Sequence, residues 1–90
     1  MKIVSKPIEM IAWFHRKKWP EPVKFRFLKL QDDYEDTKVI KVDRVTEIKE
    51  EKRAGIRTYV YRCQSIINGK EQVYELQYII EECKWRLYKI

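Results

Sequence analysis

The sequence predicts an all-β fold: a single small domain in which an antiparallel meander of about six strands forms a barrel or a strongly curved half-barrel. Apolar and polar residues alternate over most of the 90 residues, which is the pattern of half-buried strands. The two glycines and three prolines fall where these runs change direction. A chain of this length buries only about 60 to 65% of its unfolded surface, so one modest core is expected.

The first strands are predicted from the N-terminal third of the chain. Residues 1–7 are expected to be a tail or an edge segment, and the β-domain to span residues 8–90. IEMIAWF (8–14) supplies a first strand. PVKFRFLKL (22–30) then alternates cleanly, with phenylalanines on one face and basic residues on the other.

Residues 39–57, VIKVDRVTEIKEEKRAGIR, are interpreted as one long strand. Its apolar residues change phase near Asp43 and Arg44, which indicates a β-bulge that would curve the sheet. The alternative is an amphipathic helix over residues 45–53, because apolar residues there also fit helical spacing and the glutamates favour a helix. The strand is the preferred interpretation.

A hairpin at Asn68-Gly69 is the strongest local signal, since both residues adopt the positive φ of a type I′ turn. If these two residues form the loop, the facing apolar pairs are Cys63 with Tyr74, Tyr61 with Leu76, and Tyr59 with Tyr78. The opposite face then pairs Arg62 with Glu75, as expected of a wetter side.

A second turn at Glu81-Glu82 would add CKWRLYKI (83–90) as the last strand. It would place Trp85 opposite Tyr78 and Leu87 opposite Leu76. Five aromatic residues then share the inner face: Tyr59, Tyr61, Tyr74, Tyr78 and Trp85. We expect the N-terminal strands to cover them as a core, rather than leave them as an open platform for stacking bases.

The cysteines, the histidine and the acidic residues do not predict catalytic chemistry. On the predicted register Cys63 and Cys83 lie too far apart for a disulfide, and neither has a partner at metal-ligand spacing. His15 has no nucleophile placed to act with it. QDDYED (31–36) lacks the spaced ligands and glycine of a calcium loop and is expected to be a solvated loop. No cofactor or metal is expected, and the chain is predicted not to be an enzyme. The alternative is a small enzyme whose catalytic residues converge from distant parts of the sequence.

The positive charge lies in the first third of the chain. Residues 1–30 carry eight Lys or Arg against two Glu, which equals the net charge of +6 of the whole chain. WFHRKKWPEP (13–22) concentrates it in a loop between two strands. Cations neutralise phosphates and an exposed indole stacks on a base, which suits a site for single-stranded nucleic acid. The candidate residues are Arg16, Lys17, Lys18, Trp19, Lys24 and Arg26. The alternative is that Trp19-Pro20 only caps one end of the barrel.

From Pro22 onward the chain resembles a family of small, uncharacterised bacterial all-β domains. The resemblance rests on PVKF, VIKVDRV, TYVYRC, the NGK turn, YELQY and CKWRLYKI. Members of that family stand alone or accompany proteins related to Y-family DNA polymerases, and similar short proteins occur in mobile elements. The resemblance implies an accessory role near DNA and supplies no catalytic residue.

Two functions are therefore predicted from different classes. The first is a non-enzymatic accessory module that binds DNA or RNA weakly through the basic loop, or assists a DNA-handling protein. The second is a protein-interaction module that uses a sheet edge or the apolar residues Leu28 and Leu30. The N-terminal MKIVSKPIEM has no signal-peptide pattern, and the longest apolar runs are far too short to span a bilayer. A cytoplasmic location without a membrane partner is expected.

Overall fold

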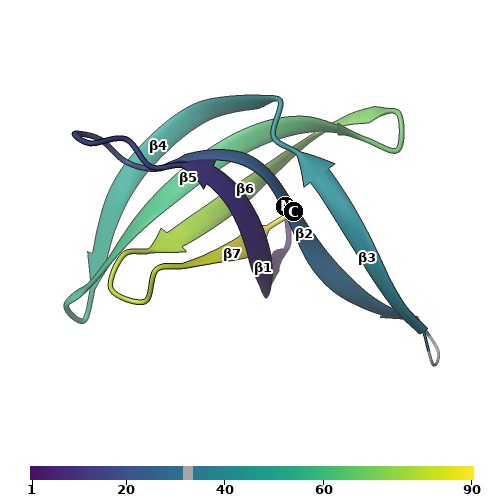
Figure 1. The fold of residues 1–90 in the computed structure, drawn as a ribbon, viewed down its shortest axis with the longest axis horizontal. Coiled ribbons are helices and arrows are strands. Elements are labelled where there is room, and N and C mark those ends of the chain that lie inside the picture. Colours follow the sequence, from purple (N-terminus) through teal and green to yellow (C-terminus); the bar gives the residue numbers. More distant parts are fainter. Residues whose placement is uncertain (32–33) are drawn as a thin grey trace.

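The protein folds as a curled antiparallel half-barrel, which confirms the predicted all-β fold class (Figure 1). The computed structural model describes the backbone of residues 1–31 and 34–90, and the side chains of residues 1–27 and 38–90. Its seven strands are β1 (Ile3–Trp13), β2 (Glu21–Gln31), β3 (Tyr34–Lys41), β4 (Arg44–Arg53), β5 (Ile56–Ile67), β6 (Lys70–Ile79) and β7 (Lys84–Lys89).

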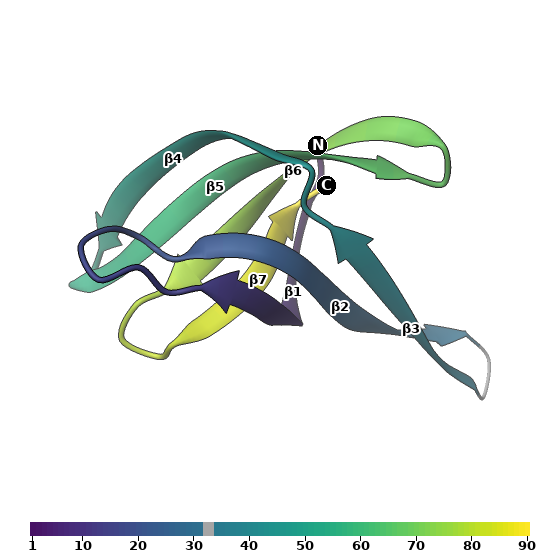
Figure 2. The same ribbon diagram turned by 45° about the horizontal axis from the view of Figure 1, so that its top comes forward.

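The strand order is β3-β2-β1-β7-β6-β5-β4, so β1 lies between β2 and β7, and β3 and β4 are the outer strands. This differs from a meander in simple chain order, because the N-terminal half of β1 pairs with β7 and its C-terminal half pairs with β2. The register shifts between Ile3 and Lys6, where Ser5 has a φ of 44°, and such a bulge bends the strand. Residues 3–7 belong to β1 and are not a tail. In the described part of the chain they pair with β7 alone, because the pairing with β2 begins at Glu9, so they form an edge segment, which is one of the two predicted possibilities. Lys2 and Ile90 exchange backbone hydrogen bonds of 2.7 and 3.0 Å, so the termini adjoin (Figure 2).

The predicted register of β5, β6 and β7 is confirmed. Cys63 faces Tyr74, Tyr61 faces Leu76, Tyr78 faces Trp85, and Leu76 faces Leu87. Asn68 and Gly69 have φ values of 53° and 77°, as a type I′ turn requires. Glu81 and Glu82 are the centre of the next turn, which closes through a 3.3 Å hydrogen bond from Cys83 N–H to the Ile80 carbonyl.

Residues 39–57 form strands and not a helix, but they do not form one long strand. The chain turns a corner at Val42 and Asp43 between β3 and β4. Val42 N–H donates to the Val23 carbonyl at 2.9 Å, and the Asp43 carboxylate accepts from Ile66 N–H at 2.9 Å, so these bonds tie the corner to β2 and β5. The predicted bulge occurs slightly later, between Val45 and Glu47.

Two shorter segments also differ from the sequence interpretation. Ala54 and Gly55 have φ values of 49° and 82° and form a two-residue turn, which ends β4 at Arg53 and starts β5 at Ile56. β3 begins at Tyr34, so residues 34–36 of the acidic QDDYED segment belong to a strand and not to a loop. Asp32 and Asp33 lie outside the described residues. The side chains of Leu28 and Leu30 also lie outside the described residues.

The core occupies the concave interior and contains the predicted aromatic ladder. Tyr61, Tyr74, Tyr78 and Trp85 are buried, while Tyr59 is half-buried. Phe25 of β2 covers the ladder, with its ring centroid 5.7 Å from that of Tyr74. The aromatic residues therefore form a core rather than an open stacking platform.

Cys63 makes the stability of this core sensitive to alkaline pH. Both cysteines are free, but Cys63 is buried and Cys83 is exposed. Burial raises the pKa of the Cys63 thiol to about 12, whereas an unfolded chain ionises it near 8.5. A folded pKa above the unfolded value means that the stabilisation is complete below about pH 8.5 and is lost as pH rises toward 12.

We therefore expect Cys63 to lower the free energy of unfolding by about 1.2 kcal/mol between about pH 9 and 10. Burial also raises the pKa of Tyr61, Tyr74 and Tyr78, whose phenols ionise near pH 10 in an unfolded chain, so they begin to add to the fall as pH approaches 10. Urea unfolding at several pH values measures the slope, with Cys63→Ala as the control. The fall in its stability between about pH 9 and 10 should be smaller by the contribution of Cys63, which leaves only the part that comes from the phenols. An equally steep fall in that variant would contradict the assignment to Cys63.

Candidate nucleic-acid interface

Residues 14–20 connect β1 to β2 at one end of the half-barrel, and we call them the basic loop (Figure 1). Arg16, Lys17 and Lys18 follow one another in it, and all three are exposed. Within the described side chains, none of the three takes part in an ion pair. Three adjacent positive charges are therefore available to an anionic ligand.

The end of the basic loop is anchored to the core. Pro20 is buried, and its carbonyl accepts a 2.6 Å hydrogen bond from the Tyr61 hydroxyl. His15 Nε2 lies 3.0 Å from Glu21 Oε2, which joins the start of the loop to the start of β2. Because both ends are held, the charged tip between them projects from a fixed base. Pro20 thus folds back onto the barrel, as the capping interpretation expected.

Three exposed aromatic side chains flank the charged tip. Trp13 is 69% exposed, Phe14 66% and Trp19 42%. Trp13 alternates with the half-buried Ala12 along β1 and so stands on the outer face of the sheet. The Phe14 ring packs edge-on against Tyr78, with centroids 6.0 Å apart. Large exposed aromatics around a basic tip provide surfaces on which bases could stack.

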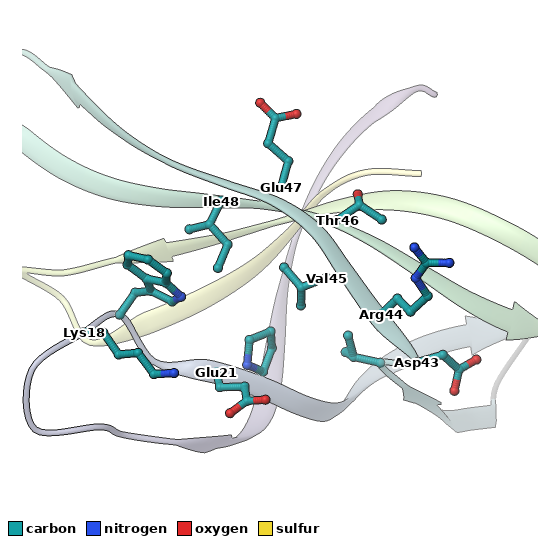
Figure 3. A pocket seen from close by; sticks show the side chains of 11 residues that line it. Lys18, Glu21, Asp43, Arg44, Val45, Thr46, Glu47 and Ile48 are labelled. Atoms are coloured by element: carbon teal, nitrogen blue, oxygen red, sulfur yellow. The ribbon is translucent and has the colours of Figure 1, made fainter.

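Trp19 and Lys18 line an open groove of about 500 Å³ between the basic loop and β4. Val45 and Ile48 of β4 point into this space from the side opposite Lys18 and Glu21, whereas Glu47 points away from it (Figure 3). Trp19 therefore lies beside aliphatic side chains and retains an exposed part. Its placement fits partial capping together with an available ring surface.

Of the carboxylates that line the groove, Asp43 and Glu21 already have hydrogen-bonding partners, and Glu47 points away from it (Figure 3). Asp43 accepts from Ile66 N–H at 2.9 Å, and Glu21 pairs with His15 at 3.0 Å. In the part of the chain whose side chains are described, no three His, Cys, Asp or Glu residues gather closely enough to hold a metal ion.

The structure does not bring all six predicted site residues together. Lys24 and Arg26 lie on the outer face of β2, alternating with the buried Phe25. The Arg26 guanidinium donates to the Glu9 carboxylate at 2.9 Å, so its charge is already matched. The basic tip and Trp19 form one part of the site, and Lys24 lies further along β2.

Sequence reasoning missed three residues of this surface: Trp13, Phe14 and Lys41. IEMIAWF is predicted from the sequence as a first strand with no faces assigned to it, although the alternation of Ile8, Met10 and Ala12 already places Trp13 on the other face. Lys41 could not be found from its neighbours, because only the pairing of β2 with β3 places it opposite Lys24.

No known protein family, no curated protein and no solved structure matches this chain. The resemblance to the small bacterial β-domains therefore stays a prediction. Among the described residues there is no helix of the length and apolar character needed to cross a membrane.

Proposed function

We propose that this chain is a non-enzymatic accessory module that binds single-stranded nucleic acid weakly through the basic loop, or helps a DNA-handling protein to do so. The observation that carries the proposal is the anchored loop itself. It presents Arg16, Lys17 and Lys18, which form no ion pair with any side chain that the structure describes, between the exposed rings of Trp13, Phe14 and Trp19.

The arrangement favours single strands over duplexes for a physical reason. The bases of a duplex are stacked on one another, so exposed indoles gain little from them, whereas the bases of a single strand can stack on aromatic side chains. The cations contribute a sequence-independent attraction to phosphates that weakens with salt. Weak, salt-sensitive binding with little sequence preference is expected.

Replacing Trp13 by alanine tests the stacking part of the proposal. Trp13 is 69% exposed, so its removal should change the stability of the fold by no more than about 0.5 kcal/mol. If a base stacks on it, Trp13→Ala should weaken binding to a labelled single strand by about 5- to 150-fold. Fluorescence anisotropy at low salt measures this change.

Ile66→Ala is the matched control, because Ile66 is also a large apolar residue, 67% exposed, on β5 away from the basic loop. This control should bind as the wild type does. Equal affinities of the wild type, Trp13→Ala and Ile66→Ala would remove Trp13 from the site. Equal loss in the two variants would show that exposed apolar surface in general, and not stacking at the loop, controls binding.

A protein-interaction module is the second candidate, and the free edges of the half-barrel favour it. β3 and β4 are the two outer strands, and the groove beside β4 is open. An unpaired strand edge offers backbone groups to a partner strand. The bulge between Val45 and Glu47 and the charged residues that follow it are features that discourage such pairing. A dimer insensitive to salt in size-exclusion chromatography would support this candidate over nucleic-acid binding.

A further inference from the structure

We propose that the nucleic-acid site continues from the basic loop onto the outer face of β1, β2 and β3, where Lys24 and Lys41 together bind a phosphate group of the same strand. This inference rests on the proposed function and extends it by a second anion site. In this proposal Lys41 is a phosphate-binding residue and Arg26 is not.

Lys24 and Lys41 are directly opposite each other on neighbouring antiparallel strands, and both are exposed. Side chains in this relation have Cβ atoms about 4.5 to 5.5 Å apart, and like charges placed so destabilise a sheet. Within the described side chains, no carboxylate pairs with either lysine. A shared anion would relieve the repulsion, and a phosphate carries the charge and acceptor oxygens to do so.

Arg26 lies on the same face, and its positive charge is neutralised by an acidic neighbour. It faces Glu9 across the β1–β2 pair, and the two side chains form a 2.9 Å ion pair. At the next row of the same face, Lys24 faces Ile11 instead of an acidic residue. Among the described side chains, Lys24 and Lys41 are therefore the pair in this row that has no acidic partner.

The surface beside Lys24 is hollowed rather than flat. A depression of about 480 Å³ is lined by residues that include Ile11, Lys24, Arg26 and Val39. Ile11 is 57% exposed and Val39 59% exposed, so apolar walls stand next to the cations. This combination suits a nucleotide, in which a charged phosphate adjoins a weakly polar sugar and base.

The depression lies on the same face of β1 as Trp13, which precedes the basic loop. Trp13 and Ile11 point to the same outer face of β1, two residues or about 7 Å apart. Ile11 faces Lys24, which faces Lys41. A strand whose base stacks on Trp13 can therefore continue across Ile11 to the lysine pair without leaving this face.

The test compares the double variant Lys24→Gln/Lys41→Gln with the wild type. Loss of the shared phosphate contact should weaken binding to an oligothymidine of about 12 nucleotides by about 5-fold at 0.1 M salt, and should make the salt slope shallower by about 0.7. An oligothymidine of about 4 nucleotides is near the smallest site size of single-strand-binding folds. It can occupy the loop alone and should lose little affinity. The melting temperature should not fall, because the like-charge pair is gone.

Lys70→Gln/Lys84→Gln is the matched control, because it removes the same charge from exposed positions on β6 and β7. Equal losses in the two double variants would overturn the site, since net charge alone would then explain the effect. Unchanged binding in Lys24→Gln/Lys41→Gln, with binding lost on charge reversal in the basic loop, would overturn this inference and leave the proposed function standing. Failure of the wild type to bind either oligonucleotide would overturn both.

Discussion

Reversing two charges in the basic loop, Lys17→Glu with Lys18→Glu, is expected to weaken binding of a single strand by at least about 25-fold at 0.1 M salt. On single strands each phosphate contact contributes about 0.7 to the slope of log K against log salt. Two lost contacts therefore reduce the affinity at 0.1 M by about 1.4 decades and make the slope shallower by about the same amount. Repulsion from the new carboxylates adds to the loss.

The side chains of Lys17 and Lys18 are exposed and lie outside the anchored end of the loop, so the fold should be unaffected. The control is Lys70→Glu with Lys84→Glu, which makes the same change in net charge on β6 and β7. Fluorescence anisotropy across a salt series compares the two. An unchanged affinity and slope in the loop variant would exclude the basic loop from binding.

Leu76→Ala is expected to produce the largest loss of stability. Leu76 is fully buried on β6, between Tyr61 of β5 and Leu87 of β7. Removing its buried methyl groups costs the transfer free energy and leaves a cavity, typically 2 to 5 kcal/mol in total. For a domain of this size we expect a loss of about 3 kcal/mol and a fall of roughly 12 to 24 °C in melting temperature.

Val73→Ala on the same strand is the matched control, because Val73 is 37% exposed and lies outside the core. It should cost less than about 1 kcal/mol. Thermal unfolding followed by circular dichroism separates the two variants. A small effect of Leu76→Ala, similar to that of Val73→Ala, would contradict the described packing of β5, β6 and β7.

The C-terminal half of the fold could be predicted in detail because its signals are local. The Asn68-Gly69 turn fixes one register, and the turn at Glu81-Glu82 fixes the next. A slip of one residue would turn every core side chain outward, so the alternation of Tyr61, Cys63 and Ser65 is compatible with one pairing only. Short hairpins of this kind are specified by the residues that form them.

The N-terminal half could not be predicted as fully, because its pairings are distant in sequence. β1 pairs with β7, and these two strands lie at opposite ends of the sequence. No local pattern in residues 3–7 indicates that β7 is the partner. The corner between β3 and β4 depends on Ser65 of β5, whose hydroxyl donates to the Lys41 carbonyl at 2.6 Å. Such hydrogen bonds become visible only once the sheet has curled.

The basic part of the candidate site could be predicted, because the sequence itself shows where the charged residues are. The run Arg16, Lys17, Lys18 was identified as the basic tip, and the structure leaves it exposed. Arg26 is no longer proposed as a phosphate-binding residue, because β1 places Glu9 beside it. Lys41 is added to the proposed site, because β3 places it opposite Lys24. Whether a charged residue on a sheet is neutralised depends on its cross-strand neighbours, and the sequence alone does not show which residues these are.

The most direct test of the account is the salt dependence of binding between the wild-type protein and a labelled single strand of about 12 nucleotides. If Arg16, Lys17 and Lys18 each contact a phosphate and Lys24 and Lys41 share one, log K should fall with log salt with a slope of about −2.8. Duplex DNA of the same sequence should bind more weakly. A slope near zero, or no binding to the single strand at low salt, would contradict the nucleic-acid interface.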